Sequence, residues 1–197
     1  MQSDLRRFAS LVSWVISPIV VAPAAYCCLA LFGYPDDPGR YAWLTVLFFA
    51  ATVVPMFLVY GLKKIGRVSD YNITFREQRF LPLLVLVGIN ALAYELMQQL
   101  GAPRFLTGIL FFNAVNTVFI LLITLQWKIS IHLFSLASSI ALLYLQFGGA
   151  MLWLLCVAPL LMWSRVYLKA HNVMQTLVGS VIGFLLMYAE FKWWIAL

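Results

Sequence analysis

Long apolar runs, separated by short polar breaks, fill most of this chain. The hydrocarbon core of a bilayer takes about 20 apolar residues per helix, and only helices or closed barrels satisfy the backbone there. The runs are continuous and lack the alternation of barrel strands, so helices are expected. They predict spans at residues 9–32, 41–62, 81–100, 105–126, 129–147, 149–164 and 171–190. The sequence thus predicts an all-α, polytopic membrane helix bundle with six to seven transmembrane helices.

The composition leaves no room for a water-soluble domain. Hydrophobic residues make up 64% of the chain and charged residues 10%, too few to cover a normal water-facing surface. We therefore expect one integral membrane domain over residues 1–197. Only a tight turn at Gly148 and Gly149 separates the fifth and sixth runs, which is why six remains the alternative count. The first run is expected to kink at Pro18 or Pro23.

The basic residues predict an orientation if there are seven spans. One side then carries Arg6, Arg7, Lys63, Lys64, Arg67, Arg76, Arg79, Lys128, Arg165 and Lys169, and the other only Arg40, Arg104 and Lys192. The positive-inside rule makes the first side cytoplasmic. The net charge of +6 is thus a topology signal and an attraction to anionic lipid headgroups. Nucleic acid is not an expected partner, because no soluble basic face exists to bind it.

Three polar clusters interrupt the runs, at residues 67–82, 127–132 and 164–175. Two predicted spans separate each cluster from the next, so all three are expected on the same side of the membrane. Together they supply four cations, one hydroxyl and both histidines of the chain: Arg76, Arg79, Lys128, Arg165, Ser130, His132 and His171. Arginine forks match phosphate oxygens, and histidine moves protons near neutral pH. This set suits phosphoryl chemistry, whereas so few carboxylates make a metal site a poorer interpretation.

The third cluster contains a spacing that favours an oriented histidine. If residues from 171 onward are helical, His171 and Gln175 lie one turn apart on the same face. The Gln175 carbonyl oxygen can then accept a hydrogen bond from one imidazole nitrogen and direct the other outward. An imidazole held in this way can act as a nucleophile.

These clusters resemble the type 2 phosphatidic acid phosphatase (PAP2) superfamily, whose signature is K-x6-R-P, P-S-G-H and S-R-x5-H-x3-D. The third part is matched by Ser164, Arg165 and His171, with Gln175 in the place of the Asp, and the second keeps Ser130 and His132 without its Pro and Gly. In the first part Arg79 lies three residues before Pro82, and Asn72 occupies the Lys position. Either Arg76 or Lys128 then supplies the missing cation. The resemblance covers a core of about residues 60–190. The motif pattern is similar to that of a divergent bacterial branch of the superfamily.

The resemblance implies a metal-independent, cofactor-free lipid phosphatase. In such a site His171 is the nucleophile, His132 the general acid and Gln175 the orienting partner, while Arg165, Ser130 and Arg79 hold the phosphate. The expected partners are the bilayer and a phosphorylated lipid or isoprenoid: phosphatidic acid, phosphatidylglycerol phosphate or a prenyl diphosphate. The expected location is a bacterial inner (cytoplasmic) membrane with the site on the cytoplasmic side.

The alternatives are an inactive lipid-phosphate binding or transport protein and a lipid phosphotransferase. The degraded first motif and Gln175 support the inactive alternative. A neutral amide orients an imidazole without raising its basicity as a carboxylate does.

Two glycines in the last run carry a separate prediction. Gly179 and Gly183 are four residues apart and so lie on the same face of a helix. Such a pair usually allows another helix to approach closely.

Overall fold

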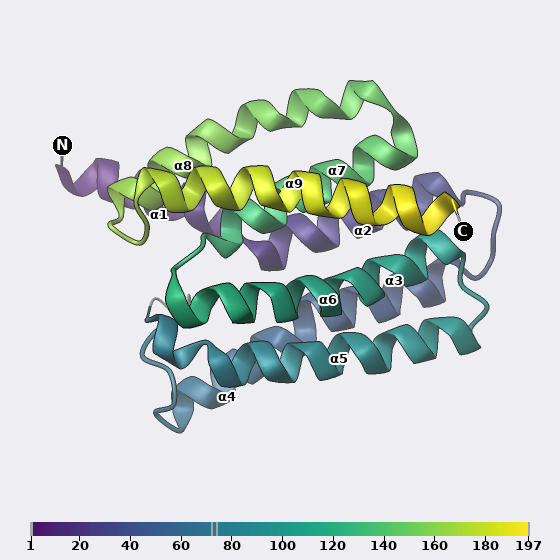
Figure 1. Cartoon of the computed structure of the whole chain (residues 1–197), viewed down its shortest axis with the longest axis horizontal. Coiled ribbons are helices and arrows are strands. Elements are labelled where there is room, and N and C mark those ends of the chain that lie inside the picture. The colour runs from purple at the N-terminus through teal and green to yellow at the C-terminus, as the bar shows by residue number, and fades with distance from the viewer. Residues whose placement is uncertain (1, 72, 74, 197) are drawn as a thin grey trace. The chain divides into compact units, whose positions relative to one another are not determined.

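A computed structural model describes residues 2–71, 73 and 75–196, and no strand occurs among them (Figure 1). The predicted position Asn72 lies outside the described residues. The chain divides into two compact units, one of residues 1–28 and 129–197 and the other of residues 29–128. Each unit is described by itself.

The first unit begins with two helices where a single span was predicted. Helix α1 (Gln2–Val15) and helix α2 (Pro18–Gly33) meet at an angle of 41°. The break lies at Ile16 and Ser17, since Pro18 lacks an amide hydrogen and disfavours helical geometry in the residue before it. Pro23 lies inside α2. The kink predicted for this run is thus present, at the first of the two prolines.

The rest of the first unit is a helical hairpin followed by a long last helix. Helix α7 (Ile131–Phe147) turns at Gly148, whose φ of 85° requires a residue without a Cβ. A 3₁₀ segment (Gly149–Val157) then continues into helix α8 (Ala158–Tyr167), and helix α9 (Val173–Ala196) closes the unit. Buried apolar side chains of α7 and α8 form a core cluster: Leu133, Leu136, Ile140, Ala158 and Leu161. The tight turn predicted at Gly148 is therefore present.

Helices α7 and α9 approach each other closely at the two glycines. A Cβ atom on Gly179 would lie 2.8 Å from the Ser130 carbonyl oxygen, and one on Gly183 would lie 2.5 Å from that of Phe134. The Ser138 hydroxyl donates a hydrogen bond to the Gly183 carbonyl oxygen at 2.9 Å. The close helix packing predicted from the glycine pair is confirmed.

The second unit contains one long helical stretch and one helical hairpin. Helix α3 (Arg40–Phe48) passes through a π segment (Phe49–Val53) into helix α4 (Val54–Lys64). Pro55 follows this segment and cannot donate a helical hydrogen bond, which accounts for the irregular turn. A short 3₁₀ turn (Arg76–Gln78) leads into α5 (Phe80–Gln99), which packs on α6 (Arg104–Gln126).

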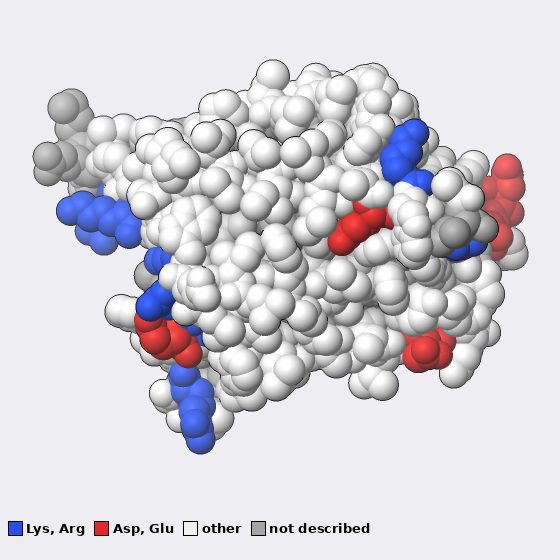
Figure 2. Space-filling model, in the orientation of Figure 1, with Lys and Arg blue, Asp and Glu red and all other residues white. Residues whose placement is uncertain are grey.

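The helices have the length and composition of membrane spans. Among the described residues five helical stretches qualify: Arg40–Lys64, Arg76–Gln99, Arg104–Gln126, Gly149–Tyr167 and Val173–Ala196. The bent α1–α2 pair makes six, and α7 is shorter at 17 residues, because Trp127 and Ser130 are extended rather than helical. Figure 2 shows charged side chains toward the helix ends and uncharged surface between them. The polytopic helix bundle is confirmed.

Candidate phosphate site in the first unit

The connection from α8 to α9 joins the backbones of Arg165 and His171. Lys169 adopts a left-handed conformation with φ of 55°, and its amide donates to the Val166 carbonyl oxygen at 2.9 Å. The Ala170 amide donates to the Arg165 carbonyl oxygen at 3.1 Å, and the His171 amide reaches the same oxygen at 3.2 Å. This pattern is the Schellman motif that commonly ends helices. The five residues between Arg165 and His171 thus form a compact turn with a fixed geometry.

Helix α9 begins with a reciprocal cap. The Gln175 amide donates to Asn172 Oδ1 at 2.9 Å, and the Asn172 amide donates to Gln175 Oε1 at 3.2 Å. This is a capping box, in which the residue before the helix and the third helical residue satisfy each other's amides. The prediction that residues from 171 onward are helical was wrong at its first two positions, because the helix starts at Val173.

The cap also holds the imidazole. His171 Nδ1 lies 3.1 Å from Gln175 Oε1, the oxygen that accepts the Asn172 amide. An amide oxygen only accepts, so Nδ1 is the donor in this contact. The contact predicted between these side chains is present, but it arises from the capping box rather than from helical spacing.

The second motif lies against the third. Ser130 precedes α7, and its amide donates to the Gln175 carbonyl oxygen at 3.2 Å. Ser130 is wholly buried, and its hydroxyl oxygen has no hydrogen-bond partner among the described residues. His132 follows in the first turn of α7 and is buried as well. A buried hydroxyl beside amides at a helix N-terminus is suited to an anion.

Helix α1 contributes contacts that sequence reasoning missed. Arg165 is 4% exposed, and its Nη1 donates to the Ser13 hydroxyl at 2.6 Å. The Ser164 hydroxyl donates to the Ala9 carbonyl oxygen, also at 2.6 Å. Ala9, Val12 and Ser13 are buried on one face of α1, and this helical spacing was the one signal for the contact.

The comparisons with known proteins agree with the motifs. Residues 112–196 match the family model of the PAP2 superfamily. This segment is similar to the PAP2 superfamily. The matched segment holds Ser130, His132, Arg165, His171 and Gln175. Searches of curated proteins and of solved structures found no match for the chain.

The other three predicted cations, Arg76, Arg79 and Lys128, lie in the second unit. Arg79 is 3% exposed, and its Nε donates to the Ile73 carbonyl oxygen at 2.9 Å. Arg76 is 43% exposed and forms an ion pair with Glu77 at 2.9 Å, while Lys128 is half-buried. Arg79 thus shares the burial of Arg165, whereas Arg76 is a surface residue with an acidic neighbour.

A cavity of about 270 Å³ lies between α8 and α9, within residues 112–196. It is lined by Met162, Trp163, Val166, Tyr167, Val173 and Thr176. Val166 follows Arg165 in the chain and Thr176 follows Gln175, so the cavity adjoins the motif residues. Its lining is almost entirely apolar and aromatic, as expected of a surface that contacts hydrocarbon.

The first unit holds side chains of the kinds that bind phosphate. Within the part of the chain that the structure describes, no three His, Cys, Asp or Glu side chains gather as metal ligands do. The buried Arg165 guanidinium, the buried Ser130 hydroxyl and the His171 imidazole belong to the first unit, where backbone hydrogen bonds join His171 to Arg165 and Ser130 to Gln175. Guanidinium, hydroxyl and imidazole groups are kinds of side chain that bind phosphate.

Proposed function

We propose that this protein is a metal-independent membrane lipid phosphatase that works through a phosphohistidine intermediate. Its substrate is a phosphate monoester or diphosphate of a lipid, of the phosphatidic acid, phosphatidylglycerol phosphate or prenyl diphosphate class. The observation that carries the proposal is the shared oxygen of Gln175, which accepts from the Asn172 amide and lies 3.1 Å from His171 Nδ1. That arrangement leaves Nε2 as a nucleophile.

The proposed reaction has two steps. His171 Nε2 attacks phosphorus while the ester bond breaks, and His132 gives its proton to the leaving oxygen. Gln175 accepts from Nδ1–H as positive charge develops on the imidazole. In the second step His132 takes a proton from water, the water oxygen bonds to phosphorus and the P–N bond breaks. His171 recovers its lone pair, and inorganic phosphate is released.

The phosphate oxygens are assigned to Arg165, Ser130 and Arg79. Fixed cations and donors stabilise the charge that spreads over these oxygens in the transition state. The Ser130 hydroxyl is buried and has no hydrogen-bond partner among the described residues, which supports its place in this set. Arg79, which lies in the second unit, is included only because the motif resemblance assigns it. Either Arg76, which pairs with Glu77, or Lys128 would supply the second cation.

The lipid nature of the substrate is supported by the apolar cavity beside the motif. A phosphate held by Arg165 would leave the rest of the molecule next to Val166 and Tyr167. A hydrocarbon chain gains about 0.8 kcal/mol for each methylene group that it buries on such a surface. The proposal therefore favours an amphiphile over a soluble phosphate ester.

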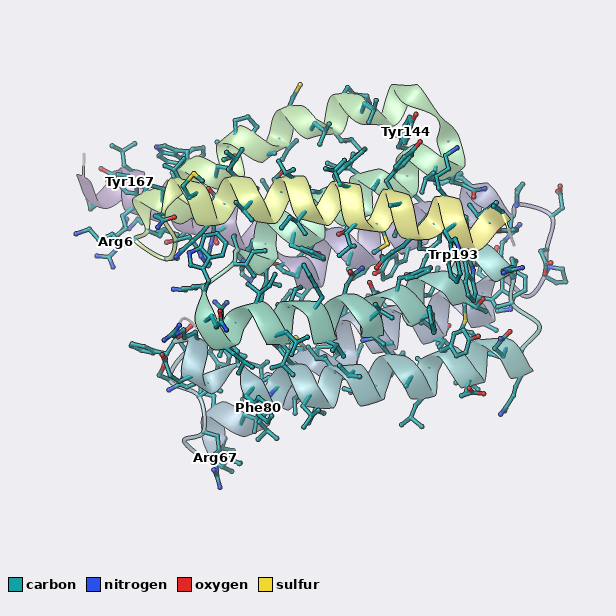
Figure 3. All side chains as sticks on the ribbon, viewed as in Figure 1. Arg6, Arg67, Phe80, Tyr144, Tyr167 and Trp193 are labelled. Atoms are coloured by element: carbon teal, nitrogen blue, oxygen red, sulfur yellow. The ribbon has the colours of Figure 1, made fainter. Side chains whose placement is uncertain are left out.

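The site is proposed to face the cytoplasm of a bacterial inner membrane. Arg6 and Arg7 are exposed on α1, which packs on α8 beside Arg165. Figure 3 shows Arg6 and Tyr167 at the same end of the first unit. Basic residues next to spans mark the cytoplasmic side.

The proposal is tested by phosphate release from lipid phosphates in detergent with EDTA present. His171→Ala is expected to abolish release, and His132→Ala to slow it by about 100-fold or more, the size of a general-acid contribution. Ser10→Ala is the matched control, because Ser10 lies on the exposed face of α1. Unchanged release by His171→Ala would contradict the phosphohistidine. Binding without release by the wild type would favour an inactive binding protein, and transfer to an added alcohol would indicate a phosphotransferase.

A further inference from the structure

Helix α1 lies outside the segment that matches the PAP2 superfamily, yet it contacts three consecutive residues of α8. The Phe8 and Trp163 rings lie 5.8 Å apart. The next residue, Ser164, donates its hydroxyl to the Ala9 carbonyl oxygen, and Arg165 donates Nη1 to the Ser13 hydroxyl. Both hydrogen bonds measure 2.6 Å and are buried. The N-terminal helix is thus attached to the part of α8 that carries the motif arginine.

We propose that Ser13 is a positioning residue for Arg165, and that α1 is therefore a functional part of the phosphate site. The inference rests on the proposed function, because it assigns Arg165 to the phosphate. A guanidinium is a rigid planar fork of five N–H donors. Fixing Nη1 on the Ser13 hydroxyl fixes that plane and the directions in which the other N–H groups point.

The kind of side chain that accepts the hydrogen bond from Arg165 affects the net charge at the phosphate site. A hydroxyl accepts the hydrogen bond without placing a negative charge next to the phosphate. An Asp or Glu at position 13 would hold the fork equally well, but it would offset the positive charge that the phosphate needs. Ser13 thus orients Arg165 and leaves its attraction for an anion in place.

The backbone of Arg165 also connects Ser13 to His171, the proposed nucleophile. The Arg165 carbonyl oxygen accepts the His171 amide at 3.2 Å. A guanidinium fixed by Ser13 is therefore attached, through one residue, to the turn that carries the imidazole. Correct placement of both groups relative to phosphorus is what makes the attack efficient.

The test compares Ser13→Ala, Ser13→Thr and the exposed control Ser10→Ala in the full-length protein. For each, kcat and KM are measured on phosphatidic acid, and the affinity for inorganic phosphate is measured by calorimetry. Ser13→Ala is expected to lower kcat/KM and phosphate affinity by about tenfold each, the size of a hydrogen bond to a charged group. Ser13→Thr, which keeps the hydroxyl, is expected to restore most of both. Ser10→Ala is expected to match the wild type.

Two further variants separate positioning from simple stability. In an Arg165→Lys background, Ser13→Ala is expected to cause no further loss, because the fork that it orients is gone. If Ser13→Ala does not fold, Ser13→Cys provides the same test, since sulfur is a weak acceptor in a side chain of similar shape. A lower melting temperature with unchanged kcat/KM and phosphate affinity would overturn the inference.

The outcomes also distinguish this inference from the proposed function. Wild-type turnover together with an unaffected Ser13→Ala variant refutes the role of Ser13 and leaves the phosphatase standing. Tenfold weaker phosphate binding by Ser13→Ala, in a protein that releases no phosphate from any lipid, supports the role of Ser13 and refutes the phosphatase. A wild type that neither binds nor releases phosphate contradicts both.

Discussion

Replacement of Gln175 by Ala removes one oxygen that contacts both Asn172 and His171. Gln175 Oε1 accepts the Asn172 amide at 3.2 Å and lies 3.1 Å from His171 Nδ1. The first contact caps α9, and the second holds the imidazole. The substitution is therefore expected to lower both stability and turnover, by amounts that can be worked out separately.

Loss of the cap is expected to cost about 1 kcal/mol of unfolding free energy. For a chain of this size that corresponds to a fall of about 2–4 °C in melting temperature. The hydrogen bond to His171 strengthens as the imidazole becomes cationic on attack, and a bond to a charged group is worth about 1.5–3 kcal/mol. Its loss from the transition state is expected to reduce kcat by about 10- to 100-fold.

The assay measures kcat on phosphatidic acid and thermal melting for Gln175→Ala, Gln175→Glu and Asn172→Ala. Asn172→Ala removes the other half of the capping box and leaves the oxygen near His171, so it is expected to lower the melting temperature with a much smaller loss of kcat. Gln175→Glu keeps the acceptor and adds a carboxylate that raises imidazole basicity, so its kcat is expected to equal or exceed that of the wild type. Equal kcat for Gln175→Ala and Asn172→Ala would refute the orienting role.

Three further predictions concern the fold and the cations. Gly183→Ala is expected to destabilise the protein by about 1–3 kcal/mol, because its Cβ would lie 2.5 Å from a carbonyl oxygen of α7. Gly88→Ala, which meets nothing within 4 Å, is its control in thermal melting and is expected to be stabilising by about 0.5–1 kcal/mol. Lys169→Gly is expected to stabilise by up to about 1 kcal/mol, since its φ of 55° strains a residue with a Cβ; a lower melting temperature would argue against the Schellman turn. Arg79→Ala is expected to reduce kcat/KM by about 100-fold and Arg76→Ala by less than about fivefold, because Arg76 is an exposed ion-pair residue. Equal losses for the two arginines would contradict that ranking.

The sequence predicted most of the helices, because their apolar length and Gly/Pro breaks are local features. It did not predict the exact lengths and helix types of the segments that are close to the minimum length needed to cross a bilayer. Trp127 and Ser130 are extended, which shortens α7 to 17 residues, and residues 149–157 form a 3₁₀ helix rather than an α-helix. Both depend on how the ends of apolar runs pack, which hydropathy does not report.

The site was predictable where its geometry is local. The spacing of His171 and Gln175 indicated their contact, although the capping box that creates it was not foreseen. Ser13 could not be found in this way, since it lies 152 residues from Arg165 and looks like any small residue in an apolar run. Contacts between distant helices depend on tertiary packing, which the spacing of residues along the chain does not report.

The central claim is that His171 forms a covalent bond to phosphorus. The direct measurement is a rapid acid-free quench of the full-length protein during turnover of a lipid phosphate, followed by mass spectrometry of the phosphorylated peptide. The account predicts an acid-labile phosphate on His171 that decays as inorganic phosphate appears, and none in His171→Ala. Turnover without phosphate on His171 at any time, or a phosphoenzyme that persists in His171→Ala, would contradict it.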